Sequence, residues 1–208
     1  NEIFGKRYPK YFRKEHIHYY KEQSPEELAM INYTSGTTGF SKGVMLPYRA
    51  LWGNIDYVLK CLAPNVKPGS NLVSILPMAH MYGLAVEFLF GFINGCHLYF
   101  LNRMPSPSLI AEAFAEVKPR LIVAVPLVIE KIIRRKVLAE VQTNRMKLLL
   151  NMPVINKKIK QHIRDRIMEA FGGNAFEIIV GGAPLNQGIE EFLNSVGVPV
   201  TIGYGTTE

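Results

Sequence analysis

The sequence predicts an α/β fold with a mainly parallel sheet that is covered by helices on both faces. Two observations lead to this prediction. Short apolar runs typical of strands alternate with longer segments of helical periodicity along most of the 208 residues, and this order is typical of parallel sheets. Two of the later runs also read as buried strands that end in a glycine turn, which is where parallel sheets bind their ligands.

The elements follow from the periodicity of apolar residues. Two short strands, at 29–34 and 44–46, are joined by a loop rich in glycine and hydroxyl groups. The remaining predicted strands are 71–76, 97–101, 121–125, 176–180 and 198–203, and the predicted helices are 47–62, 84–94, 108–116, 127–139, 157–171 and 187–195. We expect the helix at 84–94 to be buried and to wall an apolar tunnel.

Residues 1–28 differ from the rest because they mix basic and aromatic side chains. Such a mixture is also found where proteins bind single-stranded nucleic acid. No recognised nucleic-acid module follows, so we interpret 1–28 as an irregular lead-in that packs as an arm of a larger domain, and we expect no nucleic-acid partner. Residues 29–208 then form the central α/β part.

Composition indicates a soluble globular protein. Hydrophobic residues make up 48% of the chain, and no apolar run reaches the roughly 18 residues of a membrane span. The start lacks both an initiator methionine and the apolar stretch of a signal peptide, so we expect further residues before it. Cys61 and Cys96 lie in separate predicted elements without metal-binding spacing. We expect two packed thiols, which suits a reducing cytoplasm.

The net charge of +7 is concentrated in one segment. Residues 131–166 hold eleven lysines and arginines and two acids, and their apolar residues recur at helical spacing at Ile159, Ile163 and Ile167. A basic amphipathic helix can lie on an anionic bilayer, which would give a peripheral membrane contact. The alternative, which we favour, is a surface helix whose apolar stripe faces the core.

The segment from Tyr33 to Val44 reads Tyr-Thr-Ser-Gly-Thr-Thr-Gly-Phe-Ser-Lys-Gly-Val and has the composition of a phosphate-binding loop. Its glycines let the backbone approach a ligand closely, and its hydroxyl and N–H groups donate to anionic oxygens. Lys42 adds a positive charge. A Walker A loop is excluded because Gly43 follows the lysine instead of preceding it. A flexible surface linker is the alternative, but a linker does not need the flanking apolar runs.

Two further motifs follow predicted strands. One of them, residues 76–84, reads Leu-Pro-Met-Ala-His-Met-Tyr-Gly-Leu. The other has two parts: residues 178–185 read Ile-Ile-Val-Gly-Gly-Ala-Pro-Leu, and residues 203–208 read Gly-Tyr-Gly-Thr-Thr-Glu. By itself, His80 would more often be a structural histidine and Tyr204 a core aromatic residue. Because the strands before them are predicted to be parallel, their carboxyl ends can converge on one crevice.

The three motifs together resemble those of the adenylate-forming superfamily, the acyl-CoA synthetases and their relatives. The resemblance covers about 24–208, which corresponds to the central part of the large N-terminal domain. Ser41 stands where proline is common in the family, and we expect a slightly looser turn. The family continues with a ribose-binding aspartate, a hinge and a small domain that carries a catalytic lysine. We therefore expect this chain alone to have little ligase activity and at most weak nucleotide affinity.

The resemblance implies roles for individual residues. His80 would orient the carboxylate substrate or close its pocket, Tyr204 would stack on adenine, and Glu208 would hold Mg²⁺, a cation that prefers carboxylate and phosphate oxygens. Catalytic roles are implied for Lys42, His80, Thr207 and Glu208. Nucleotide binding is implied for Thr34, Ser35, Gly36, Thr37, Thr38, Gly39, Lys42, Gly181, Gly182, Ala183, Pro184, Gly203, Tyr204, Gly205, Thr206 and Thr207.

The implied reaction is ATP-dependent activation of a carboxylic acid. The carboxylate attacks the α-phosphorus of ATP to give acyl-AMP and pyrophosphate, and coenzyme A then displaces AMP. The run at 125–132, the basic segment after it and the form Gly-Gly-Ala-Pro-Leu look most like the long-chain fatty-acid branch. Two alternatives stay open: a ligase for another carboxylate, of the aryl or luciferase-like kind, and a non-catalytic nucleotide-binding module.

Overall fold

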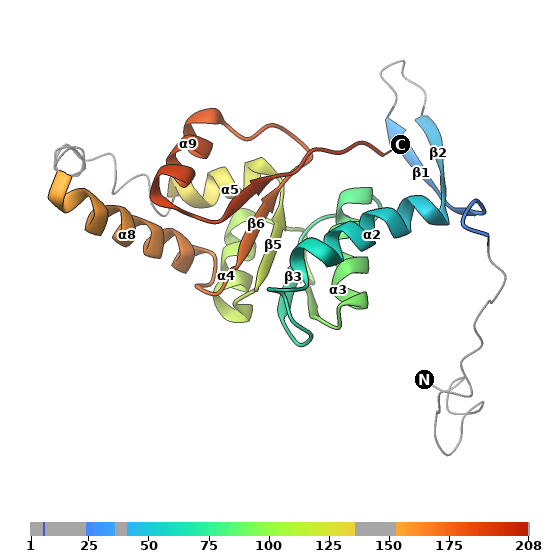
Figure 1. Cartoon of the computed structure of the whole chain (residues 1–208), viewed down its shortest axis with the longest axis horizontal. Coiled ribbons are helices and arrows are strands. Elements are labelled where there is room, and N and C mark those ends of the chain that lie inside the picture. The colour runs from blue at the N-terminus through green and yellow to red at the C-terminus, as the bar shows by residue number, and fades with distance from the viewer. Residues whose placement is uncertain (1–5, 7–23, 36–40, 136–152, 208) are drawn as a thin grey trace.

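The computed structural model describes residues 6, 24–35, 41–135 and 153–207. Within these ranges, five parallel strands form one sheet in the order β4-β3-β5-β6-β7 (Figure 1). The predicted α/β class with a parallel sheet is thereby confirmed. The strands are β3 (Asn71–Ser74), β4 (His97–Phe100), β5 (Leu121–Ala124), β6 (Glu177–Val180) and β7 (Val200–Ile202).

Several predictions fall on residues outside these ranges. They concern most of the lead-in at 1–28, the loop at 36–40, the end of the helix predicted at 127–139, and Glu208. The lead-in ends where β1 begins at Leu28, one residue before the strand predicted from the sequence.

An antiparallel hairpin precedes the sheet. It consists of β1 (Leu28–Ser35) and β2 (Ser41–Pro47) and forms a sheet of its own. The glycine-rich loop therefore joins two strands, as predicted. The second strand begins earlier than expected, because Ser41 pairs with Ser35 and Lys42 pairs with Thr34. Lys42 thus lies in a strand rather than in the loop.

Helices cover both faces of the parallel sheet. One face carries α2 (Tyr48–Leu62), the π-helix η2 (Gly83–Leu89) and α3 (Phe90–Ile93), and the other carries α4 (Pro107–Val117), α5 (Pro126–Ile133), α8 (Pro153–Ala170) and α9 (Gln187–Val196). Along β5, Leu121 and Val123 pack toward the first group, whereas Ile122 and Ala124 pack toward the second. Successive side chains of a strand point to opposite faces, so a strand that is apolar throughout is buried on both sides.

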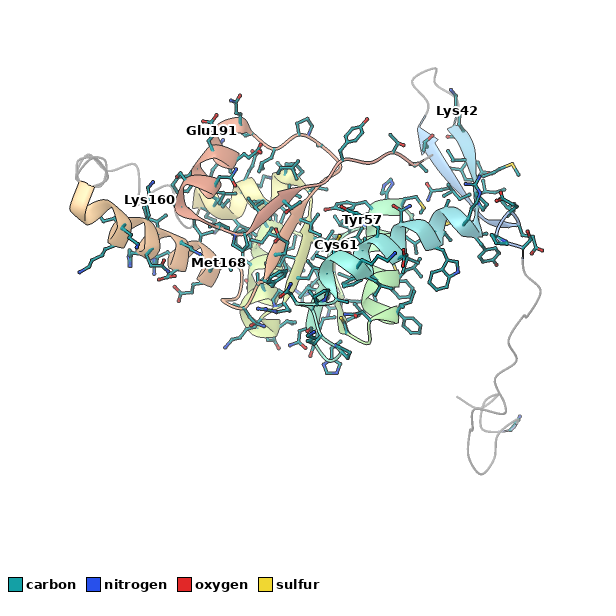
Figure 2. The ribbon with its side chains drawn as sticks, viewed as in Figure 1. Lys42, Tyr57, Cys61, Lys160, Met168 and Glu191 are labelled. Carbon is teal, nitrogen blue, oxygen red and sulfur yellow. The ribbon has the colours of Figure 1, made fainter. Side chains whose placement is uncertain are left out.

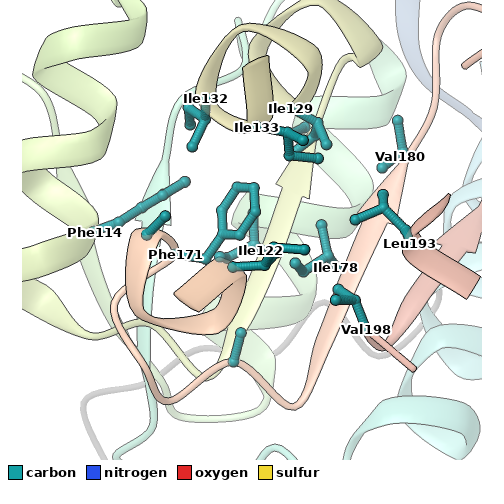
Figure 3. Close-up of a cluster of buried hydrophobic side chains, with 14 of the residues drawn as sticks. Phe114, Ile122, Ile129, Ile132, Ile133, Phe171, Ile178, Val180, Leu193 and Val198 are labelled. Carbon is teal, nitrogen blue, oxygen red and sulfur yellow. The ribbon is translucent and has the colours of Figure 1, made fainter. Parts of the chain in front are cut away.

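The larger core lies on the side of α4, α5, α8 and α9 (Figure 3). Phe114 of α4 and Phe171 after α8 are fully buried and lie 6.2 Å apart between ring centroids. Ile163 and Ile167 of α8 are 3% and 0% exposed. The apolar stripe of this basic helix therefore faces the core, which confirms the interpretation favoured from the sequence. Within the described ranges, no helix is long and apolar enough to cross a bilayer.

Local signals explain where two of these helices begin. The Ser106 side chain accepts a hydrogen bond from the Leu109 N–H at the start of α4, and Asn186 accepts from the Ile189 N–H at the start of α9. Side-chain acceptors at this position satisfy N–H groups that have no partner inside the helix. Pro107 follows at the first position of α4, where a missing N–H costs nothing.

The segment predicted as a buried helix at 84–94 differs from the expectation. It begins as a π-helix, and it is buried on one face only, because Phe92 is 70% exposed and Ile93 is 43% exposed. The reason is its position over β4, which lies at the edge of the sheet. The tunnel expected behind this helix stays a prediction.

The two cysteines are free thiols, as expected. Cys96 is half-buried, and burial raises the pKa of its thiol. Cys61 is exposed on α2 (Figure 2), so the prediction that both thiols are packed is wrong for Cys61.

The order of the strands places a topological switch beside β3. The chain crosses from β3 to β4 by way of η2 and α3 on one face, and from β5 to β6 by way of α5 and α8 on the other. Connections that leave neighbouring strands toward opposite faces open a crevice at the carboxyl ends of those strands. The segments that follow β3, β6 and β7 therefore lie at the edge where a ligand is expected.

Candidate functional site

The candidate site lies at the carboxyl edge of the parallel sheet, where segments from three motifs come into contact. The first of these segments is the turn from Leu76 to Tyr82, which we call the His80 loop. It follows β3 and leads into η2. Backbone hydrogen bonds shape it, since the His80 N–H donates to the Pro77 carbonyl at 3.0 Å and the Leu84 N–H donates to the His80 carbonyl at 2.9 Å.

The hairpin contacts the His80 loop through Asn32. The side-chain amide of Asn32 donates to the backbone carbonyl of Ala79 at 2.8 Å. Asn32 is only 5% exposed, whereas its neighbours Ile31 and Tyr33 are 46% and 69% exposed. In this part of β1, the polar side chain of Asn32 is therefore buried and the apolar side chains beside it are exposed. The contact joins the strand before the glycine-rich loop to the residue before His80.

The His80 loop also contacts the third motif. The Tyr82 hydroxyl donates to the Ile179 carbonyl of β6 at 3.1 Å. Its ring lies against Gly181, where a β-carbon would come within 3.0 Å of Tyr82 Cζ and 3.2 Å of the Gly203 carbonyl oxygen. A β-carbon at 181 would therefore require these neighbouring groups to move by a few tenths of an ångström. Burial, and secondarily the charge of Glu87, raises the pKa of Tyr82 well above its usual value, so the hydroxyl stays protonated and able to donate.

A buried carboxylate holds the start of the His80 loop. Glu87 of η2 is 2% exposed and accepts three hydrogen bonds, from the Ser74 hydroxyl at 3.0 Å, the Ile75 N–H at 3.2 Å and the Leu76 N–H at 3.1 Å. Burial raises the pKa of Glu87 to about 7, although these hydrogen bonds act in the opposite direction. Glu87 thereby satisfies the backbone groups where β3 ends.

The helix that carries Glu87 packs closely on the loop. A β-carbon at Gly83 would lie 2.6 Å from the Pro77 carbonyl oxygen, a distance that side chains do not adopt. Gly83 and Glu87 belong to the same π-helix, a rare geometry that is found mostly as short segments at functional sites. Together they fix the direction in which the His80 loop leaves the sheet.

Sequence reasoning missed Asn32, Tyr82 and Glu87. A signal for two of them was present. Glu87 is the one charged residue in the apolar run from Leu84 to Ile93, and Asn32 interrupts an apolar strand. An isolated polar residue in an apolar segment is either misplaced or paired, and in both cases here the structure supplies the partner.

The predicted site residues are mostly solvent-accessible. Lys42 is exposed near the end of the hairpin where β1 and β2 are joined (Figure 2), and the His80 side chain is exposed at the turn. Tyr204 is 96% exposed, so the alternative of a core aromatic residue is wrong. Gly182, Ala183, Pro184, Gly205 and Thr206 are exposed as well, and Thr34, Gly203 and Thr207 are half-buried.

The contacts unite the three motifs without involving every predicted residue. They involve Gly181 and Gly203 directly and lie one residue from His80 and two residues from Thr34. Ser35 ends β1. Gly36, Thr37, Thr38, Gly39 and Glu208 lie outside the described residues.

Comparison with solved structures identifies the class of protein. The adenylation domain of a carboxylate reductase from Mycobacterium chelonae has a TM-score of 0.63 and 31% identity, over 88% of this chain and 27% of that one. ATP-bound MatB from Rhodopseudomonas palustris has a TM-score of 0.61 and 27% identity, over 89% of this chain and 30% of that one. The fold is therefore that of adenylate-forming enzyme domains.

Sequence comparison identifies the family. The profile of the AMP-binding enzymes matches residues 5–208, and the chain belongs to that family. Long-chain-fatty-acid–CoA ligase 5 of Mus musculus is 32% identical over 200 residues, and ligase 4 of Saccharomyces cerevisiae is 30% identical over 197 residues. Each alignment covers 88% of this chain but only 29% and 28% of the relative. The chain thus spans less than a third of the length of these relatives.

Proposed function

We propose that this chain forms part of a ligase that activates a fatty acid with ATP, first to acyl-AMP and then to acyl-CoA. The observation that carries the proposal is the meeting of the three motifs at one edge of the sheet, through the Asn32–Ala79 and Tyr82–Ile179 hydrogen bonds and the contact of Gly181 with Tyr82. A parallel sheet binds its ligand at this edge. Membership of the AMP-binding enzyme family supports a nucleotide as that ligand.

The proposed roles follow from the chemistry of the side chains. Lys42 and the hydroxyl and N–H groups of the loop before it would bind the phosphates. Gly181 to Pro184 would line the adenine and acyl side, and the exposed ring of Tyr204 would stack on adenine. Thr207 would donate to the α-phosphate, and the exposed imidazole of His80 would orient the carboxylate.

The first step brings two anions together. A carboxylate oxygen forms a bond to the α-phosphorus while the bond from that phosphorus to the bridging oxygen breaks, and pyrophosphate leaves with the electron pair. No proton has to be removed from a carboxylate at neutral pH, so catalysis depends on positioning and on donors that offset charge. The thiolate of coenzyme A then attacks the acyl carbon, and AMP leaves.

Magnesium fits this proposal as a partner of the phosphates. The described part of the chain contains no group of three or more His, Cys, Asp or Glu side chains suited to hold a metal. Mg²⁺ does not need such a group where one carboxylate and the substrate phosphates coordinate it, and we propose Glu208 as that carboxylate. When bound, the ion would offset negative charge on the triphosphate.

The substrate class rests on the sequence relatives. Their names specify long-chain fatty acids, whereas two structural relatives are a carboxylate reductase and MatB. The first half-reaction is compatible with all of these, so another carboxylate is the alternative substrate. A non-catalytic nucleotide-binding module is the alternative to an enzyme.

We also propose a cytoplasmic location with peripheral membrane contact.

Nucleotide binding by this chain tests the proposal. In a titration of ¹⁵N-labelled protein with MgATP, we expect weak binding, with amide shifts concentrated at Thr34, Lys42, 181–183 and 203–207. Lys42→Met should weaken binding about tenfold or more, because a charge-assisted contact to phosphate contributes about 1.5–3 kcal/mol. Lys158→Met is the matched control, since Lys158 is equally exposed but lies on α8. It should leave binding unchanged.

Two results would contradict the proposal. One is the absence of any shift at millimolar MgATP, and the other is a set of shifts around Lys158 and the basic segment instead of the carboxyl edge. A panel of long-chain, short-chain and aryl acids, assayed for pyrophosphate release, separates the substrate classes and the non-catalytic module. From this chain alone we expect release to be slow or undetectable.

A further inference from the structure

We propose that Asn32 is a positioning residue that fixes the hairpin carrying Lys42 relative to the loop carrying His80. The proposal rests on the proposed function, because it assigns to these two segments the phosphates and the carboxylate that must react. Asn32 itself touches neither substrate. It acts through the hydrogen bond from its side-chain amide to the Ala79 carbonyl.

The burial of Asn32 indicates a specific role for its amide. In β1 the flanking apolar side chains are largely exposed, whereas the amide is buried and paired at 2.8 Å with a residue 47 positions away. Burying an amide is unfavourable unless it is hydrogen-bonded. The strand therefore orients this polar side chain inward at the cost of exposing Ile31 and Tyr33.

The Asn32–Ala79 hydrogen bond lies close in the chain to both Lys42 and His80, the two residues that it would align. Asn32 pairs with Val44 across the hairpin, and Thr34 pairs with Lys42 two residues further along β1. Two strand residues span about 7 Å. On the other side, Ala79 immediately precedes His80. A displacement of the hairpin relative to Ala79 would therefore change the separation of Lys42 and His80 directly.

The His80 loop can hold this bond in place because η2 and the parallel sheet fix its two ends. Glu87 binds the N–H groups of Ile75 and Leu76 at its start, and Tyr82 binds the Ile179 carbonyl at its end. The hairpin belongs to a separate sheet. Asn32 thus connects a separate element to one that is fixed, and reaction rates fall about 100-fold for misplacements on the order of 1 Å.

The chain contains a matched control for this residue. The side-chain amide of Asn71, at the start of β3, donates to the Val117 carbonyl at 2.8 Å. This bond also joins a partly buried asparagine in a strand to a distant backbone carbonyl, with a separation of 46 residues compared with 47 for Asn32. Asn71 lies at the amino end of β3, away from the carboxyl edge. Removing either amide removes one hydrogen bond to a backbone carbonyl.

The test compares Asn32→Leu with Asn71→Leu by NMR of the histidine imidazoles in the nucleotide-free chain. Leucine has the same number and branching of non-hydrogen side-chain atoms as asparagine but is larger and cannot donate. The His80 signal is assigned by its loss in His80→Gln. We expect Asn32→Leu to shift or broaden the His80 signal and Asn71→Leu to leave it unchanged, although both variants should lose comparable thermal stability. Asn32→Ser, a smaller change, serves if Asn32→Leu does not fold.

A second arm adds MgATP. In the wild type, nucleotide binding at the hairpin should move the His80 signal, and in the Asn32 variants this response should be lost at saturating nucleotide. An unchanged His80 signal in the Asn32 variants without nucleotide would overturn the inference, and so would an equal change in Asn71→Leu. If the wild type binds no MgATP, the proposed function fails, while the result without nucleotide still decides the role of Asn32.

Discussion

Glu87 shows how one buried residue links the stability of the chain to pH. Its carboxylate is almost fully buried at the end of β3, and burial raises its pKa from 4.5 to about 7. The charge of Glu87 also contributes to raising the pKa of the neighbouring Tyr82, so the Tyr82 hydroxyl stays neutral. The folded state therefore binds a proton that the unfolded chain releases near pH 4.5, and protonated Glu87 favours folding.

The sign of this effect gives a prediction. Below pH 4.5 both states are protonated and the stabilisation is fully present, whereas between pH 4.5 and 7 it is lost as the pH rises. The total loss is about 3 kcal/mol, from about 1.4 kcal/mol per pKa unit. Glu87→Gln, which cannot titrate, should have a flatter dependence of the unfolding free energy on pH between 5 and 7.5. Urea unfolding at a series of pH values measures this.

Glu191→Gln is the control for that measurement. Glu191 lies exposed on α9 (Figure 2), and its carboxylate accepts a hydrogen bond from Gln187 at the surface. This variant should keep the pH dependence of the wild type. An equally steep pH dependence in Glu87→Gln and in the wild type would show that Glu87 is not the responsible group.

At the scale of the element, the π-helix η2 owes its position to the lack of a side chain at Gly83. The Pro77 carbonyl oxygen occupies the space that a β-carbon at Gly83 would need. Helix propensity alone would favour alanine over glycine by roughly 0.5–1 kcal/mol at an interior position. Packing and propensity therefore oppose each other at this residue, and packing decides.

Two glycine variants separate these effects. Gly83→Ala should destabilise the chain by about 1–3 kcal/mol, because backbone has to move to relieve the overlap. Gly53→Ala should instead stabilise it by roughly 0.5–1 kcal/mol, because Gly53 lies within α2 and a β-carbon there would meet nothing within 4 Å. Thermal or urea unfolding gives both values. A stabilising Gly83→Ala would mean that η2 is not packed on Pro77 as described.

Element boundaries show what periodicity predicts well. The predicted helix 108–116 and strand 121–125 differ by one residue at their ends from α4 and β5. The hairpin is less well predicted, because β2 begins at Ser41 whereas the sequence suggested a start at 44. Polar residues such as Ser41 and Lys42 carry no apolar signal, and only the ladder to Ser35 and Thr34 places them in the strand.

For the molecule as a whole, the apolar stripe of α8 and the lysine side chains of α8 have separate roles. The apolar stripe is buried, so it does not provide a face for insertion into a bilayer. The side chains of Lys157 and Lys158 are exposed, and that of Lys160 is half-buried. A membrane contact through this helix would therefore be electrostatic, and such contacts contribute about 1 kcal/mol per lysine near an anionic surface.

Liposome flotation tests this contact. Charge reversal of Lys157, Lys158 and Lys160 to Glu should weaken binding to phosphatidylserine-containing vesicles by on the order of 100-fold, from about 1 kcal/mol for each lost lysine. Reversal of the exposed residues Lys67, Arg103 and Lys118 changes the net charge equally and should have a smaller effect. Equal partitioning of all three proteins would remove the proposed membrane contact.

The class of fold and the motifs of the candidate site can be predicted from local patterns in the sequence. Apolar runs such as 121–124 are the direct cause of burial on both faces of a sheet, and the glycine-rich segments carry their chemistry in local composition. These properties depend on residues close together in the chain, so they can be predicted without coordinates.

How the motifs are held together depends on contacts that exist only in the folded chain. The Asn32–Ala79 bond spans 47 residues, the Tyr82–Ile179 bond spans 97, and Glu87 binds groups 11 to 13 residues before it. No local pattern specifies such partners, because the chain separation of two groups says nothing about their distance in a folded sheet. The exposure of Tyr204 was decided in the same way: whether an aromatic ring is covered depends on which other segments pack over it.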